Sequence, residues 1–234
     1  MELKDLIEMY ENKKKLYGDK AYLHVSEIFR EAREEYKKEY LASPKAEKKI
    51  AQGKTPDAEQ SWKTFKGNNF ENLIWHIINS ELHNVANFRC ISGKKLGGKK
   101  LSQELSKVYR NLIVRYGPWS LLPDVDLVIY EPNSSKVLGV ISCKITLRER
   151  IAQTAYWKLK LSSDPLTMHI KGYFVTTDED GNLTKDTSSS TRNRILVEHE
   201  LDGTYSLGEV RESDKVKAFP KLIEDMRRLV IENK

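Results

Sequence analysis

The chain has 234 residues, of which 39% are hydrophobic and 32% are charged, and this composition is typical of a folded protein rather than a disordered one. It contains no run of about 18 apolar residues, and its first residues lack a signal-peptide core, so we predict no membrane span and no secretion. Two cysteines, Cys90 and Cys143, are too few for a disulfide framework or a zinc cluster, so a cytoplasmic location is expected.

The net charge of +6 is concentrated in one part of the chain. Residues 89–116 contain eight Lys or Arg side chains and a single acid, Glu104, which gives this stretch a charge of +7. A local excess of this size favours a polyanionic partner such as nucleic acid, although a solvated basic surface would have the same composition.

The first third of the chain has the apolar spacing and the helix-ending residues of helices. Gly18 is a candidate C-cap, Pro44 interrupts the second helix, and Gly67 is a candidate break in the third. The predicted elements are helices over residues 2–18 and 21–43, a polar connector over 44–57, and a helical stretch from 58 that restarts as a helix over 70–82.

The pattern after residue 84 alternates between strand and helix signals. The predicted elements are a strand at 85–92, a basic loop at 93–100, a helix at 101–116, two strands within 125–145 around a turn at 131–136, a helix at 147–163, a strand at 169–177, a hairpin at 191–210 and a final helix at 213–234. The sequence therefore predicts a mixed α/β (α+β) fold, in which helices flank a central mixed sheet and a helical region precedes them.

Two acids and a lysine stand at corresponding positions of the predicted hairpin within 125–145. Asp124 and Asp126 open its first strand on the same face, and Lys144 closes its second strand. The turn therefore brings a carboxylate and an ammonium group to one end of the sheet. A carboxylate can hold Mg²⁺, and a lysine can orient water or stabilise charge on a phosphate, so the arrangement suits phosphodiester hydrolysis.

Arg148, Glu149 and Arg150 follow Lys144 at the start of the predicted helix at 147–163. Two arginines there oppose the helix dipole, so helix stability does not explain them. Arginine can read guanine and glutamate can accept from cytosine, so the triplet has the chemistry to read C·G pairs in a major groove. Gln153 lies on the same predicted helix and is a further candidate for a base or phosphate contact.

These residues resemble the core of type II restriction endonucleases of the PD-(D/E)XK superfamily, and most closely the group that recognises CCGG, CCNGG or CCWGG sites. In that group a catalytic lysine is followed four residues later by an Arg-(Asp/Glu)-Arg element, which matches Lys144 and residues 148–150. The resemblance makes Asp124 the metal-binding aspartate, with Asp126 as its competitor. It also implies a metal-binding acid on an early helix, for which Glu71 is the candidate.

The chain departs from the superfamily pattern near Lys144. Ser142 stands where the superfamily has an acid, and Trp157 and Lys158 stand where several members of the group have a displaced acid. Glu71, Asp126 and the carbonyl of Cys143 therefore remain alternatives for the third metal ligand.

The resemblance implies a Mg²⁺-dependent endonuclease that cuts double-stranded DNA at a short G/C-containing palindrome. It further implies a homodimer and a cognate DNA methyltransferase that is not a stable partner. Residues 1–57 would grip DNA or support dimerisation, and residues 58–234 would form the nuclease core. Two alternatives stay open: a structure-specific or repair nuclease on the same core, and a DNA-binding module whose catalytic site has decayed.

Overall fold

The computed structural model describes residues 1–85, 88–148, 150–184 and 191–232. The chain forms two compact units, a helical unit (Met1–Ile77) and a sheet unit (Ile78–Lys234). This boundary falls inside a helix, whereas the functional division that the sequence suggests lies between residues 57 and 58 and stays a prediction. Within the described residues, no helix combines the length and the apolar character needed to cross a membrane.

The helical unit contains α1 (Leu3–Tyr17), the 3₁₀ helix η1 (Gly18–His24), α2 (Val25–Leu41), α3 (Pro44–Ala51) and most of α4 (Ala58–Leu82). Its apolar side chains form a core in which Leu6, Tyr10 and Ile28 are fully buried. Gly18 ends α1 with a φ of +56°, as predicted for a helix C-cap.

Two predictions for the helical unit are wrong. Residues 44–51 form α3 instead of a polar connector, because the Ser43 hydroxyl caps the helix and Pro44 occupies its first turn. Proline is well tolerated there because a first-turn N–H has no helical partner to lose. Gly67 does not interrupt α4, which runs unbroken through it. Glu71 therefore lies in the interior of a long helix rather than in its first turn.

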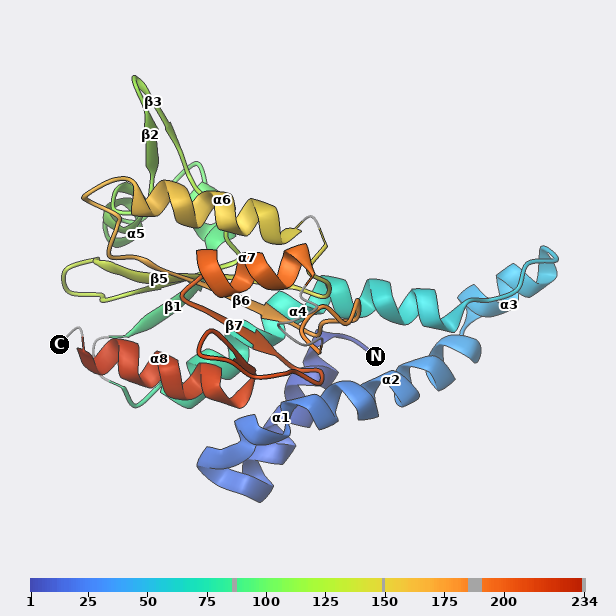
Figure 1. Cartoon of the computed structure of the whole chain (residues 1–234). Coiled ribbons are helices and arrows are strands. Elements are labelled where there is room, and N and C mark those ends of the chain that lie inside the picture. The colour runs from blue at the N-terminus through green and yellow to red at the C-terminus, as the bar shows by residue number, and fades with distance from the viewer. Residues whose placement is uncertain (86–87, 149, 185–190, 233–234) are drawn as a thin grey trace. The chain divides into compact units, whose positions relative to one another are not determined.

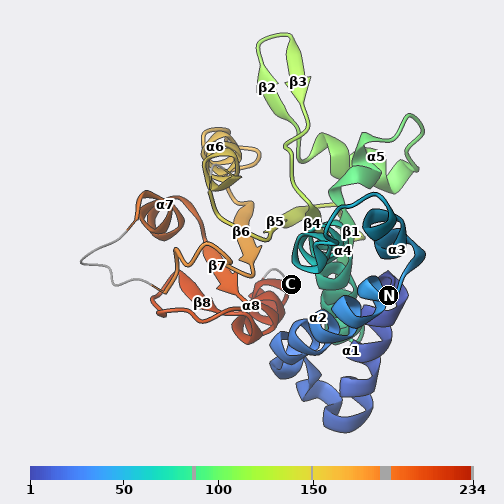
Figure 2. The ribbon, with the colours of Figure 1, turned by 90° about the vertical axis from the view of Figure 1, so that its right-hand side faces the viewer.

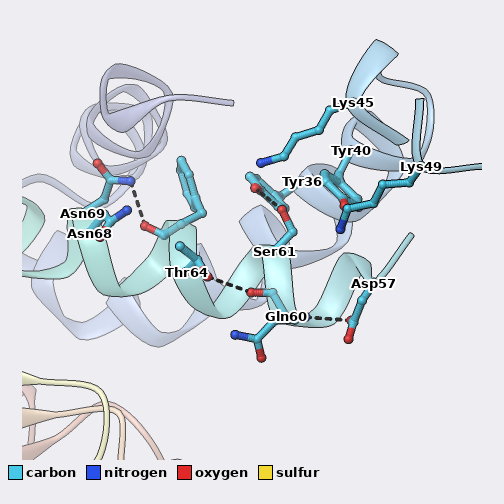
Figure 3. A pocket seen from close by; sticks show the side chains of 11 residues that line it. Tyr36, Tyr40, Lys45, Lys49, Asp57, Gln60, Ser61, Thr64, Asn68 and Asn69 are labelled. Carbon is cyan, nitrogen blue, oxygen red and sulfur yellow. Dashed lines mark hydrogen bonds between the residues drawn. The ribbon is translucent and has the colours of Figure 1, made fainter. Parts of the chain in front are cut away.

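A cavity of about 410 Å³ lies between α2, α3 and α4 within the helical unit (Figure 3). Tyr36 and Ser61 are joined across it by a hydrogen bond of 2.8 Å, and the ammonium of Lys49 lies 6.0 Å from the centre of the Tyr40 ring. None of the predicted catalytic or base-reading residues lines this cavity.

The sheet unit is built on a six-stranded mixed sheet of order β1-β4-β5-β6-β7-β8 (Figure 1). The pairs β1–β4 and β4–β5 are antiparallel, and the remaining pairs are parallel. A separate hairpin is formed by β2 and β3. The strands are β1 (Arg89–Ser92), β2 (Val114–Tyr116), β3 (Trp119–Leu121), β4 (Leu127–Tyr130), β5 (Val137–Lys144), β6 (Lys171–Thr176), β7 (Gly203–Ser206) and β8 (Val216–Ala218).

Helices cover both faces of this sheet, as Figure 2 shows. On one face, side chains of η2 (Gly93–Gly97), α5 (Gln103–Arg110) and α6 (Arg150–Ser162) pack against β4 and β5, and α6 and α7 (Arg192–Glu200) pack against β6 and β8. On the other face lies α8 (Pro220–Glu232), whose Leu229 approaches Gly139 of β5. The predicted mixed sheet with flanking helices and a helical N-terminal region is confirmed.

Three local predictions for the sheet unit are wrong. The helix expected over 101–116 ends at Arg110, and Val114–Tyr116 becomes a strand. Residues 191–210 form α7 and β7 rather than a hairpin, and residues 216–218 form β8 ahead of α8. The parallel β6–β7 pair requires a crossover, and α7 supplies it.

Candidate active site

Asp126 and Lys144 meet at one end of the β4–β5 hairpin. The Lys144 ammonium lies 2.8 Å from Oδ2 and 3.0 Å from Oδ1 of Asp126. The backbone N–H of Cys143 donates a second hydrogen bond of 2.7 Å to Oδ2. Asp126 is 8% exposed, so its carboxylate is a nearly buried charge held by one ammonium and one backbone amide. The sequence predicted that a carboxylate and a lysine would meet here, and the structure makes Asp126 the carboxylate that does so.

Backbone pairing fixes this geometry. Leu127 stands opposite Ile141 in the β4–β5 register, and the N–H of Asp126 donates to the carbonyl of Ile141 at 3.1 Å. The carbonyl of Asp126 in turn accepts from the N–H of Gly93 at 2.8 Å. A Cβ atom at Gly93 would lie 2.1 Å from the carbonyl oxygen of Val125, so only glycine fits at this position. The close approach of Gly93 therefore helps to set the position of Asp126.

Asp124 occupies a different environment from Asp126. It is exposed, and its Oδ2 accepts a 2.7 Å hydrogen bond from Nε2 of Gln153 on α6. The structure thus brings together two residues that the sequence singled out separately. It also places an exposed carboxylate two residues from the buried one, beside the first turns of α6.

Arg148 and Arg150 lie at the N-terminal end of α6, and both are exposed. Arg150 is the first residue of the helix, and Arg148 precedes it with a φ of +30°. Because side chains other than glycine are strained in this left-handed region, neighbouring groups must hold the backbone of Arg148 in place. Glu149, the third member of the predicted base-reading triplet, lies outside the described residues.

The groups that hold Arg148 come from the end of β6 and the turn after it, which the sequence indicated only as a strand end and a turn. The Asp180 carboxylate accepts from the backbone N–H groups of Leu147 and Arg148, each at 3.2 Å. The carbonyl of Ile145 accepts from the hydroxyls of Thr176 and Thr177 at 3.2 and 3.1 Å. Hydrogen bonds therefore tie this segment to both ends of the stretch 145–148.

Asp178 anchors the same turn from inside. It is buried, and its carboxylate accepts from the backbone N–H groups of Asn182 and Leu183 at 2.9 and 2.7 Å. Burial raises the pKa of Asp178, and the nearby charge of Asp180 acts in the same direction. Burial and the charge of Asp180 both disfavour the ionised form of Asp178, and the two backbone N–H groups stabilise it. These hydrogen bonds fix the conformation of the turn after β6.

The remaining predicted residues are of two kinds. Glu71 lies on α4 within the helical unit, and its role as a metal ligand stays a prediction. At the positions of the missing acids, Ser142 is buried in β5, Trp157 packs into the core under α6, and Lys158 binds Asp202 at 2.8 Å. Within the part of the chain that the structure describes, no three side chains of His, Cys, Asp or Glu gather as a metal-binding group.

Comparison with known proteins shows the family to which this fold belongs. Residues 104–227 match the model of the family described as BsaWI restriction endonuclease type 2. The chain belongs to this family of type II restriction endonucleases. The matched residues include Asp124, Asp126 and Lys144 and continue through α6 and β6 into α8.

Two curated relatives agree with this assignment. A protein of Methanocaldococcus jannaschii, provisionally named type II restriction enzyme MjaVIP, is 36% identical over 213 residues, which cover 87% of this chain and 92% of the relative. A Helicobacter pylori protein, also provisionally named, is the type II restriction enzyme HpyAORF263P. It is 39% identical over 97 residues, which cover 42% of this chain and 50% of the relative.

A solved structure supports the fold. The restriction endonuclease PspGI in complex with substrate DNA superposes with a TM-score of 0.56 at 14% sequence identity, covering 99% of this chain and 94% of that one. At this identity the likeness concerns the fold alone.

Proposed function

We propose that this protein is a Mg²⁺-dependent endonuclease that cleaves double-stranded DNA at a short G/C-containing sequence of the CCGG or CCNGG type. The observation that carries the proposal is the Asp126–Lys144 pair, a nearly buried carboxylate in contact with an ammonium group at the end of a strand hairpin. Membership of a type II restriction endonuclease family supports it. The spacing from Lys144 to Arg148 and Arg150 matches the base-reading element of the PD-(D/E)XK group.

The residues at the site fit a magnesium ion. Mg²⁺ prefers oxygen ligands and is commonly held by one or two carboxylates together with water and substrate phosphate, so a large protein cage is not needed. Asp126 and Asp124 would hold it, with Glu71 or the Cys143 carbonyl as candidates for a further ligand. When bound, the ion would polarise the phosphoryl group and counter the charge that develops on it.

The side chains of the chain itself would act as follows. Asp126 keeps Lys144 at the site, because the ammonium contacts both oxygens of a carboxylate that the Cys143 N–H also holds. Lys144 is partly exposed, so its ammonium can also face a phosphate or an attacking water molecule. It would orient that water and stabilise negative charge on the phosphate.

Sequence recognition would come from the start of α6. Arg148 and Arg150 would donate to guanine in the major groove, and Glu149 would accept from cytosine. Gln153 would reach a base or phosphate after exchanging its hydrogen bond to Asp124. Two copies of the chain would read the two halves of a palindromic site, and a separate methyltransferase would protect that site in the cell.

Digestion of a long unmethylated DNA with and without Mg²⁺ tests the proposal. Discrete fragments that require the metal are expected, and sequencing of their ends would identify the recognised site. A smear would indicate a nuclease without base reading and would refute the roles of Arg148 and Arg150. Specific binding to DNA without any cleavage in Mg²⁺ or Mn²⁺ would refute the enzymatic role and favour a decayed DNA-binding module.

A further inference from the structure

The cavity between α2, α3 and α4 has the size and the lining of a small-molecule site. Its volume of about 410 Å³ falls within the range of roughly 300–1,000 Å³ that is common for such sites. All of its lining residues belong to the helical unit, and Figure 3 shows side chains from the three helices around it. The proposed function assigns no role to any of them, so the cavity calls for a separate explanation.

One wall of the cavity carries a buried hydroxyl group without a hydrogen-bond partner. The Tyr40 side chain is only 7% exposed, and within the described ranges of the chain its hydroxyl forms no hydrogen bond. The neighbouring Tyr36 hydroxyl, by contrast, lies 2.8 Å from that of Ser61. Buried hydroxyls are almost always hydrogen-bonded, because withdrawing them from water is otherwise unfavourable. The Tyr40 hydroxyl is therefore a candidate donor to a molecule bound in the cavity.

Two ammonium groups at the cavity have no acidic partner. Lys45 and Lys49 extend from α3 toward α4 (Figure 3), and neither forms an ion pair with a residue that the structure describes. Among the described lining residues, Asp57 carries the one carboxylate, which accepts from the backbone N–H of Gln60 at 2.8 Å. The charge of the lining is therefore +1. Ammonium and hydroxyl donors that converge in this way suit an anion with several acceptor oxygens, such as a phosphate group.

We infer that this cavity binds a nucleoside monophosphate. Lys45, Lys49 and the Tyr40 hydroxyl would donate to the phosphate. The rings of Tyr36 and Phe65, whose centres lie 4.7 Å apart, belong to the same lining and offer aromatic surface on which a planar base can stack. Amide and hydroxyl groups for the sugar and the base edge belong to Gln60, Thr64 and Asn68.

The lining disfavours other occupants of the cavity. A divalent cation needs several oxygen ligands, and two ammonium groups beside one carboxylate repel it. The backbone of a DNA duplex is bound along rows of cations on an open surface rather than in a cavity with a charge of +1. A free nucleotide and the 5′-phosphorylated end of a DNA strand carry the same chemical group, so either could supply the ligand, and the experiment below separates them.

Isothermal titration calorimetry of the full chain with adenosine 5′-monophosphate (AMP), without metal, tests the inference. We expect AMP to bind at least about tenfold more tightly than adenosine or inorganic phosphate, because each of these lacks part of the contacts.

Three variants locate the ligand. Lys49→Gln should weaken AMP binding at least about tenfold, because it removes a charge-assisted hydrogen bond. Tyr40→Phe should weaken it about fivefold without lowering the melting temperature of the free protein, because the hydroxyl has no partner there among the described residues. Lys48→Gln is the control and should bind AMP like the wild type, because Lys48 is exposed on α3 and is not among the lining residues.

Absence of AMP binding at millimolar concentration would overturn the inference, and so would unchanged affinity in both Lys49→Gln and Tyr40→Phe. Inorganic phosphate that binds as tightly as AMP would refute the recognition of a nucleoside. A 5′-phosphorylated single-stranded oligonucleotide separates the two sources, because tighter binding than AMP would assign the cavity to DNA ends and weaker binding would assign it to free nucleotides. The measurement involves neither metal nor cleavage, so its outcome is independent of the proposed nuclease activity.

Discussion

Gly93→Ala places one methyl group next to the strand that carries Asp126. The new Cβ would lie 2.1 Å from the Val125 carbonyl oxygen, whereas contacts shorter than 3.0 Å are essentially never seen, so the two backbones must separate by about 0.9 Å. The Gly93 N–H donates to the Asp126 carbonyl, so the shift reaches the carboxylate. Overpacking costs about 1–3 kcal/mol, and a displacement of about 1 Å at a catalytic group costs roughly 100-fold in rate.

Urea denaturation would measure the stability of the Gly93→Ala variant, and single-turnover cleavage of a DNA duplex would measure its rate. Gly97→Ala is the matched control, because it lies in the same 3₁₀ helix and its added Cβ would meet no atom within 4 Å. We expect the control to match the wild type in both assays. If Gly93→Ala is as stable and as active as Gly97→Ala, the close approach does not position Asp126.

Three further substitutions test the base-reading segment and the ion pairs. Arg148→Ala should weaken specific binding by about 1–3 kcal/mol, measured as duplex affinity, with little change in affinity for unrelated DNA. Asp180→Ala removes the acceptor for two backbone amides and should lower discrimination between the recognised site and a one-base variant at least about tenfold. In Asp202, burial opposes the charged form, but hydrogen bonds from Lys158 and the Gly172 amide hold its pKa below the usual 3.8. Asp202→Asn should therefore destabilise the fold by about 2 kcal/mol at pH 7, and the difference should shrink as the pH falls through and below 3.8, as urea titrations would show.

Each of these expectations has a contradicting result. Equal losses of specific and unrelated binding in Arg148→Ala would make that residue a phosphate contact. Unchanged discrimination in Asp180→Ala would show that the loop keeps its shape without the carboxylate. A destabilisation by Asp202→Asn that grows toward acidic pH would have the wrong sign for a carboxyl whose pKa is lowered in the folded state.

The β4–β5 hairpin and the meeting of a carboxylate with Lys144 at its end could be predicted from the sequence. Two β-rich runs around a turn rich in Asn and Ser specify an antiparallel pair, and the side-chain alternation places Asp126 and Lys144 at the same end. The choice between Asp124 and Asp126 could not be made in this way. It depends on the register that sets Leu127 opposite Ile141 and on a helix, α6, whose Gln153 binds Asp124 instead.

The misassigned segments were those whose structure depends on distant partners. Residues 195–197 are a short apolar run ahead of the turn signal at Asp202 and Gly203, which favoured a hairpin. Arg194 is instead fully buried in α7, where it binds Glu198 and the carbonyl of Leu183. The β7 strand is buried between two parallel neighbours and needs no antiparallel partner from the preceding residues. The role of Asp180 could not be predicted either, because the sequence of an acidic turn does not indicate which backbone N–H groups will donate to its carboxylates.

Cleavage by Lys144→Ala tests the central claim most directly. Lys136→Ala is the matched control, since Lys136 is exposed at the turn end of the same hairpin. With Mg²⁺ and unmethylated DNA, we expect discrete fragments from the wild type and from the control, and none from Lys144→Ala, which should still bind the recognised duplex with nearly wild-type affinity. Fragments produced by Lys144→Ala at the wild-type rate would contradict the assignment of Asp126 and Lys144 as the catalytic pair.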